Sequence, residues 1–125
     1  MIENKCDTVE SAIKLMDYTF GITTNKEKYP TKYTRLIKRI QDTSFDIYEF
    51  VIDANRTNLK THKQERLDLQ SKAITACDKL SCYAELSYRH KRISSDSLYH
   101  WQKLISDVKY MAIAWRDSNR NSKNL

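Results

Sequence analysis

Residues 29–58 carry a mostly apolar stripe whose spacing requires a helix. Seven side chains recur at steps of four and three residues, which is the spacing of one face of an α-helix. They are Tyr33, Ile37, Ile40, Ser44, Ile47, Val51 and Ala54. The chain has one Gly and one Pro in 125 residues, which leaves little turn chemistry for β-hairpins. We therefore expect an all-α fold with this segment as its second helix.

Start signals predict three further helices. Asp7 begins a capping box ahead of the first helix, and Pro30 suits the first turn of the second. Thr61 and Gln64 resemble another capping box, and Ser94 is expected to cap the fourth helix. The buried stripes that we expect are Val9, Ala12, Ile13, Met16 and Phe20 in helix one; Leu67, Ala73, Ile74, Cys77, Leu80, Ala84 and Tyr88 in helix three; and Leu98, Trp101, Ile105, Val108, Ala112 and Trp115 in helix four.

Four such helices with short connections predict an up-down-up-down antiparallel four-helix bundle, as a single domain over residues 1–125. The polar tail, about residues 119–125, is expected to fray. No run of 18 apolar residues and no basic-plus-apolar leader occurs, so we expect a cytoplasmic protein without membrane contact. The odd set Cys6, Cys77 and Cys82 fits a reducing compartment.

Helix two carries more apolar surface than one bundle face needs. Phe45, Tyr48 and Ile52 form a further row beside the main stripe, and together the rows cover roughly 200° of the helix. This helix is either a deeply buried central helix or part of a subunit interface. An acidic row, Asp42, Asp46, Glu49 and Asp53, lies at the same spacing. We interpret it as a surface for a neighbouring copy, because the start of the same helix is basic and a heterologous contact would pair the two halves.

Basic residues gather where the predicted topology brings two connections to the same end of the bundle. They are Lys26, Lys28, Lys32, Arg35, Lys38, Arg39, Arg89, His90, Lys91 and Arg92. With a net charge of +6 and a pI near 9.2, this end is a candidate site for RNA or DNA phosphates or for an acidic protein partner. The alternative is a solvated surface that contacts no polyanion. A more dilute basic set at the other end comprises Arg56, Lys60, Lys63, Arg66, Arg116 and Arg120.

The sequence lacks the signatures of catalysis. It contains no Gly-rich phosphate loop, nucleophile elbow or zinc-type spacing of Cys and His. The acidic row on helix two has no Glu-x-x-His partner of the kind that builds metal sites in bundles. We therefore expect no enzyme activity, no metal, no cofactor and no small-molecule substrate.

Several of these residues also resemble a known family. Tyr29, Pro30 and Tyr33, the runs LIKRI at 36–40 and SFDIYE at 44–49, and DAN at 53–55 are similar to helix two of the Avd-like four-helix-bundle family. His100 with Trp101, and residues 111–115, resemble its later helices. The resemblance covers roughly residues 8–120 and is a diffuse pattern of apolar and basic positions. The same superfamily includes the intervening-sequence proteins encoded within large-subunit ribosomal RNA genes.

The resemblance implies a specific function. Avd is the accessory variability determinant of diversity-generating retroelements. It forms a basic, barrel-like homopentamer without catalytic activity, binds reverse transcriptase and supports mutagenic cDNA synthesis from template RNA. The alternative is an intervening-sequence-type bundle, associated with RNA or the ribosome, that has no polymerase partner. A third possibility is a helical adaptor that binds only protein.

Overall fold

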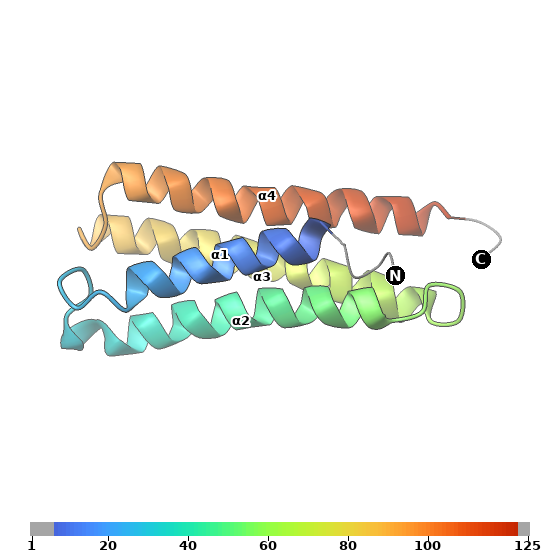
Figure 1. Ribbon diagram of the computed structural model, residues 1–125, viewed down its shortest axis with the longest axis horizontal. Coiled ribbons are helices and arrows are strands. Elements are labelled where there is room, and N and C mark those ends of the chain that lie inside the picture. The colour runs from blue at the N-terminus through green and yellow to red at the C-terminus, as the bar shows by residue number, and fades with distance from the viewer. Residues whose placement is uncertain (1–6, 123–125) are drawn as a thin grey trace.

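The regular structure of the chain is helical throughout the residues that the computed structural model describes, 7–122 (Figure 1). The elements are α1 (Asp7–Thr23), a short 3-10 helix η2 (Thr31–Tyr33), α2 (Thr34–Arg56), α3 (Lys63–Arg89) and α4 (Ser95–Arg120). Successive α-helices run in opposite directions, so their connections alternate between the two ends (Figure 1). The expected up-down-up-down antiparallel four-helix bundle is confirmed.

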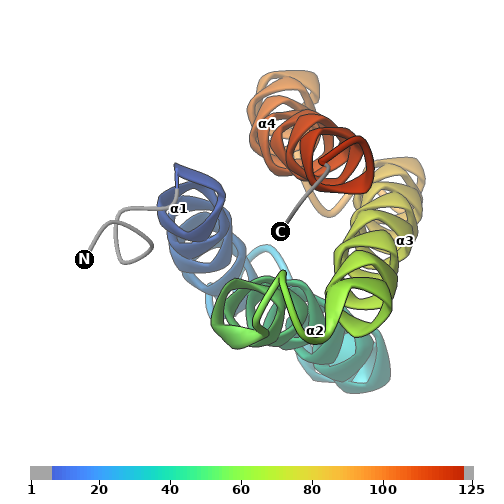
Figure 2. The same cartoon turned by 90° about the vertical axis from the view of Figure 1, so that its right-hand side faces the viewer.

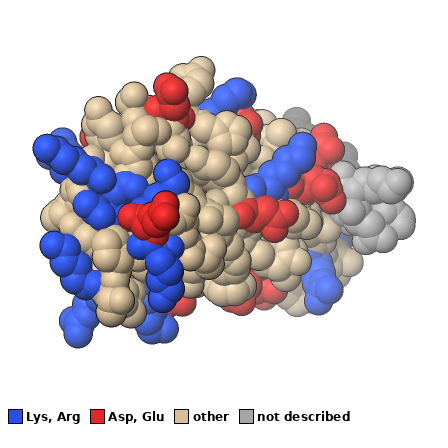
Figure 3. Space-filling view, turned by 60° about the vertical axis from the view of Figure 1, so that its left-hand side comes forward, with Lys and Arg blue, Asp and Glu red and all other residues tan. Residues whose placement is uncertain are grey.

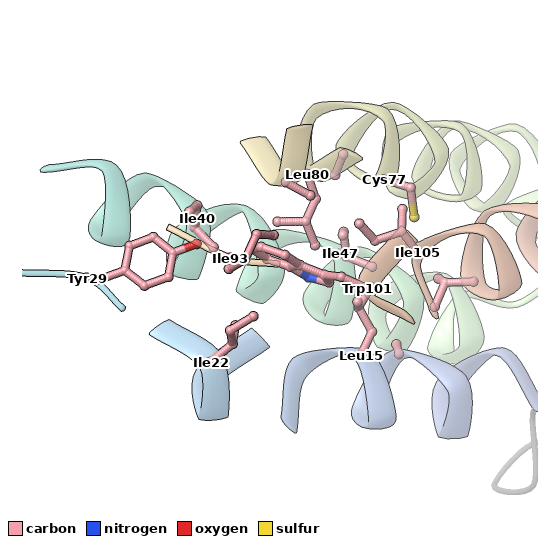
Figure 4. Close-up of a cluster of buried hydrophobic side chains, with 14 residues drawn as sticks. Leu15, Ile22, Tyr29, Ile40, Ile47, Cys77, Leu80, Ile93, Trp101 and Ile105 are labelled. Atoms are coloured by element: carbon pink, nitrogen blue, oxygen red, sulfur yellow. The ribbon is translucent and has the colours of Figure 1, made fainter. Parts of the chain in front are cut away.

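The four α-helices enclose one core. α1 packs against α2 and α4, and α3 packs against the same two helices on the other side (Figure 2). Trp101 of α4 lies in the middle of the core cluster, fully buried, with Leu15 and Ile47 near it (Figure 4). Its indole Nε1 donates a hydrogen bond of 3.0 Å to the hydroxyl of Thr19 on α1. None of the helices within residues 7–122 combines the length and apolarity needed to cross a bilayer.

The stripe on α2 faces the core as expected. Ile40, Ser44, Ile47, Val51 and Ala54 are buried, which places five of the seven predicted positions in the interior. The other two, Tyr33 and Ile37, are half-buried and lie against the edge of the core cluster. Regular spacing of three and four over several turns was sufficient to orient this helix.

The stripe predicted for α1 is wrong in orientation. Only Ala12 of that set is buried, whereas Val9, Ile13, Met16 and Phe20 are half-buried. The core face is instead Thr8, Ser11, Ala12, Leu15, Thr19, Ile22 and Thr23. Two of the buried hydroxyl groups on this face are hydrogen-bonded to neighbours. Thr23 donates to the carbonyl of Thr19 and accepts from Gln41 of α2, and Thr19 Oγ1 accepts from Trp101. The apolar row of α1 therefore lies on the flank of the bundle.

Of the predicted helix starts, one is confirmed and two are wrong. Ser94 caps α4 by accepting a hydrogen bond from the Ser97 amide. α1 begins at Asp7, the first residue that the structure describes, and the capping box expected there stays a prediction. Pro30 precedes η2, so the α-helical part of α2 begins four residues later. Thr61 does not cap α3, which begins at Lys63. The α2–α3 connection is turned instead by Asn58, whose Oδ1 accepts from the amides of residues 60 and 61.

Three predictions at the helix ends also differ from the structure. Tyr88 is 40% exposed, because Ser87 takes the core position in the last turn of α3. The tail does not fray from residue 119: α4 continues to Arg120, and Asn119 is buried. Its Oδ1 accepts hydrogen bonds from Arg66 Nε at 2.8 Å and from Gln70 Nε2 at 2.9 Å. Cys6 and the tail residues 123–125 lie outside the described residues.

Candidate nucleic-acid interface

The predicted basic residues meet at one end of the bundle. That end holds the α1–α2 and α3–α4 connections together with the first turns of α2, and Lys and Arg side chains crowd its surface (Figure 3). We call it the cationic end and define it by Lys26, Lys28, Lys32, Arg35, Lys38, Arg39, Arg89, His90, Lys91 and Arg92. Lys28 and Arg92 are half-buried, and the other eight side chains are exposed.

Few carboxylates neutralise the cationic end. Lys38 pairs with Asp42 at 3.6 Å and Arg89 with Glu85 at 3.7 Å, each one turn away on its own helix. Both pairs are solvent-exposed, and such pairs are weak enough for a phosphate to displace. Within residues 7–122, no carboxylate forms an ion pair with the remaining Lys and Arg of this end: Lys26, Lys28, Lys32, Arg35, Arg39, Lys91 and Arg92. Five of these side chains are exposed, and their charges are available to a polyanion: Lys26, Lys32, Arg35, Arg39 and Lys91.

Arg92 holds the two connections together. Its Nη1 donates to the carbonyl of Lys28 in the α1–α2 connection at 3.2 Å, and its Nε donates to the carbonyl of His90. The guanidinium also lies 4.8 Å from the centre of the Tyr33 ring, which His90 meets edge-on at 5.9 Å. Cation–π contacts of this kind keep the charge while fixing the side chain. Arg92 is therefore a positioning residue for the cationic end.

Tyr29 anchors the same end in the core. Its side chain is 1% exposed and reaches from the α1–α2 connection into the core cluster (Figure 4). Burial raises the pKa of its phenol, while neighbouring Ser87 and the charge of Arg92 act in the opposite direction. The connection that carries Lys26 and Lys28 is thus tied to the bundle at Lys28, by Arg92, and at Tyr29, by burial.

Lys91 occupies a backbone conformation that favours glycine. Its φ is +60°, and it ends α3 with the hydrogen bonds of a Schellman motif. The Lys91 amide donates to the carbonyl of Tyr88, and the Arg92 amide donates to that of Ser87. A side chain at this position strains the backbone, but here it projects a further charge from the tip of the cationic end.

Half of the second basic set is used by the fold itself. Lys63 Nζ donates to the backbone carbonyls of Arg120 and Ser122, close to the C-terminus of α4. Arg66 bonds the Thr57 carbonyl and Asn119 and lies 5.1 Å from the Trp115 ring centre, and Arg116 bonds Ser71 and pairs with Asp117. These cations link α3, α4 and the α2–α3 connection. Arg56 and Lys60 of the same set are exposed, so this end keeps fewer free cations than the cationic end does.

The predicted interface residues of α2 form a continuous surface with α1. Phe45 is 41% exposed and meets Phe20 of α1 edge-on at 5.1 Å, while Tyr48 and Ile52 are half-buried. Together with the displaced row of α1 they form what we call the α1–α2 flank: Val9, Ile13, Met16, Phe20, Phe45, Tyr48 and Ile52. Asp42, Asp46, Glu49 and Asp53 are all exposed on the adjoining face of α2. The apolar and acidic rows thus adjoin one another.

The α1–α2 flank ends in a hollow of about 730 Å³ at the end opposite the cationic one. Val9, Tyr48, Ile52 and Leu59 form its apolar part, and Arg56 and Lys60 contribute charge at its edge. The hollow is open to solvent. It shows that the side of α2 facing away from α3 is incompletely covered by the short helix α1.

The two described cysteines differ in their surroundings. Burial raises the pKa of the Cys77 thiol to about 12, with a further contribution from Asp78, so this thiol stays protonated and inert at neutral pH. Cys82 is exposed and unbonded. Within residues 7–122, no group of three His, Cys, Asp or Glu side chains is arranged to hold a metal ion.

Fold and site together define an antiparallel helical bundle with a cationic end and an uncovered apolar flank. No protein-family model matches the chain, and no curated protein matches it significantly.

Proposed function

We propose that this chain is a non-catalytic helical subunit that binds RNA or DNA through its cationic end. The observation that carries the proposal is the contrast between its two basic sets. Exposed Lys and Arg side chains without a carboxylate partner within residues 7–122 are more numerous at the cationic end: Lys26, Lys32, Arg35, Arg39 and Lys91 there, against Arg56 and Lys60 at the other end. At that other end Lys63, Arg66 and Arg116 are engaged in structural contacts. Cations without carboxylate partners gain most from contact with phosphates, because binding releases counterions from the nucleic acid.

We further propose that the subunit self-associates through the α1–α2 flank. Phe45 and its neighbours keep exposed or half-exposed apolar area that a second copy would cover, and contiguous apolar surface of this kind marks contact sites. The acidic row beside it would meet basic side chains of the neighbouring copy. Such a contact joins different patches and closes into a ring when the rotation permits.

The resemblance to the Avd-like family suggests the biological setting. We propose an accessory subunit of a diversity-generating retroelement, as a homo-oligomer of five copies, with reverse transcriptase and template RNA as partners. The cationic end would take the RNA, and reverse transcriptase would bind the assembled ring. The intervening-sequence-type alternative shares the RNA surface but has no polymerase partner. Co-purification with a reverse transcriptase encoded by a neighbouring reading frame would separate the two.

RNA binding is tested by paired charge reversals. Arg35→Glu with Arg39→Glu alters two exposed cations of the cationic end, and Arg56→Glu with Lys60→Glu alters two exposed cations at the other end. Each reversal changes the charge by two, so either double variant lowers the net charge from +6 to +2. We expect a large loss of affinity for a labelled RNA only in the first variant. The slope of log affinity against log salt concentration should become shallower by about 1.4 in that variant, or 0.7 for each phosphate that it no longer neutralises. Equal effects of the two variants would contradict the proposal.

Self-association is tested by native mass spectrometry. Phe45→Gln should shift the protein towards monomer, while Met111→Gln, which alters an equally exposed apolar side chain on α4, should leave the assembly unchanged. A wild-type protein that is monomeric at all concentrations and binds RNA without sensitivity to salt would refute the whole proposal.

A further inference from the structure

Two tyrosine rings are exposed beside the cationic end. Tyr99 lies in the second turn of α4 and is 74% exposed, and Tyr88 lies in the last turn of α3 and is 40% exposed. Gln102 on α4 and Ser81 on α3 are joined by hydrogen bonds of 2.7 and 3.0 Å, which set the register of the two helices. Tyr99 is one turn beyond Gln102 and Tyr88 is two turns beyond Ser81, both towards the α3–α4 connection. The rings therefore lie on neighbouring turns of two adjacent helices.

Cations are interleaved with these rings. Arg89 follows Tyr88 directly, Lys91 stands at the tip of the connection, and both are exposed. On the neighbouring side, the Tyr33 ring already carries the guanidinium of Arg92 at 4.8 Å and the ammonium of Lys32 at 5.5 Å. A surface with Arg and Lys around solvent-facing aromatic rings differs from an ordinary protein interface, whose centre is depleted of Lys.

Aromatic rings at a cationic surface select one form of nucleic acid. Each unpaired base offers a π face that can stack on a tyrosine, and such stacking contributes about tenfold to a hundredfold in affinity for each base. In a duplex the bases are stacked on each other and only phosphates and groove edges are offered. Resting on the proposed function, we propose that the cationic end binds single-stranded nucleic acid, with unpaired bases stacked on Tyr99 and Tyr88 and the backbone held by Arg89 and Lys91.

The chain contains a matched control. Tyr110 is 62% exposed and lies three turns further along the outer face of α4, so it resembles Tyr99 in chemistry and exposure. The lysine beside it is already paired, because Lys109 Nζ lies 2.9 Å from a carboxylate oxygen of Asp78 on α3. The bond to Asp78 also raises the pKa of Lys109. A base could stack on Tyr110, but the neighbouring phosphate would gain little, because Asp78 already neutralises the charge of Lys109.

The test compares labelled oligo(U) of about 20 nucleotides, longer than one typical single-strand site, with an RNA duplex of equal length. We expect Tyr99→Ala to weaken oligo(U) binding at least tenfold and to leave duplex binding unaltered. The slope of log affinity against log salt concentration should stay the same, because the Lys and Arg side chains still bind the same phosphates. Tyr88→Ala should act in the same direction, Tyr99→Phe should retain affinity because the ring remains, and Tyr110→Ala should bind as the wild type does. Circular dichroism checks that each variant is folded.

The outcomes separate this inference from the proposed function. If the Arg35 and Arg39 reversals abolish RNA binding while Tyr99→Ala and Tyr110→Ala bind oligo(U) equally, stacking is refuted and the cationic site stands. If neither the reversals nor Tyr99→Ala changes binding, both proposals fail. If Tyr99→Ala dissociates the assembly and leaves oligo(U) affinity intact, the exposed ring serves a protein contact and the single-strand assignment is overturned.

Discussion

The buried hydrogen bond between Trp101 and Thr19 gives the sharpest test of how α1 is held in the bundle. Both residues are fully buried, and Nε1 of the indole donates to Thr19 Oγ1 at 3.0 Å. Thr19→Val preserves the shape of the side chain but removes the acceptor, which leaves an indole N–H buried without a partner. The loss expected for such an orphaned donor is about 1–3 kcal/mol of the free energy of unfolding. For a chain of this size that corresponds to a fall in melting temperature of about 3–6 °C per kcal/mol.

A double-mutant cycle with Trp101→Phe isolates the bond. Phe lacks the N–H, so in the Trp101→Phe background the change at Thr19 no longer creates an orphaned donor. We expect the two changes together to cost about 1–2 kcal/mol less than the sum of the single changes in urea denaturation followed by circular dichroism. Thr24→Val is the matched control, because the Thr24 hydroxyl bonds only its own helix and is exposed, and it should change stability by less than about 0.5 kcal/mol. Additive effects at Thr19 and Trp101 would refute the reasoning.

Four further predictions concern individual side chains. Lys91→Gly relieves the positive φ at the end of α3 and should raise stability by about 0.5–1 kcal/mol in thermal denaturation while weakening RNA binding; lower stability would contradict the assigned cap. Asn119→Ala removes the acceptor for Gln70 and should cost about 1–3 kcal/mol in urea denaturation, whereas a frayed tail predicts no change. In a variant lacking Cys6, a thiol reagent at neutral pH should label exposed Cys82 rapidly and Cys77 only on unfolding; equal rates would refute the burial of Cys77. The pKa of Cys77 is raised to about 12 in the folded protein, above its value of about 8.5 in the unfolded chain. The contribution of this thiol to the free energy of unfolding is therefore complete below about pH 8.5 and is lost as the pH rises towards 12. Cys77→Ala should make the loss of stability at alkaline pH smaller.

Much of the site could be predicted because antiparallel topology places residues at the ends of a bundle by their position in the chain. Lys26, Arg35 and Arg89 come to one end once the number and order of helices are known. What the positions do not reveal is which cations the fold itself uses. Arg39 and Arg66 look alike as sequence, yet Arg39 is exposed with no ion pair within residues 7–122, whereas Arg66 bonds Thr57 and Asn119. Tyr99 lies off the stripe predicted for α4, which indicates an exposed position but not what the ring contacts.

The sequence alone determined the helical class, the four-helix topology and the orientation of α2, because long regular stripes such as Ile40, Ile47 and Val51 leave one face to bury. Tertiary packing decided the orientation of α1. Its core face is rich in threonine, which a periodicity of apolar residues cannot detect, and it is buried because Trp101 and Gln41 satisfy Thr19 and Thr23. That rotation moved Val9, Ile13, Met16 and Phe20 to the flank beside Phe45. The uncovered apolar surface of this protein thus arises from hydrogen bonds between helices, which form only after the chain has folded.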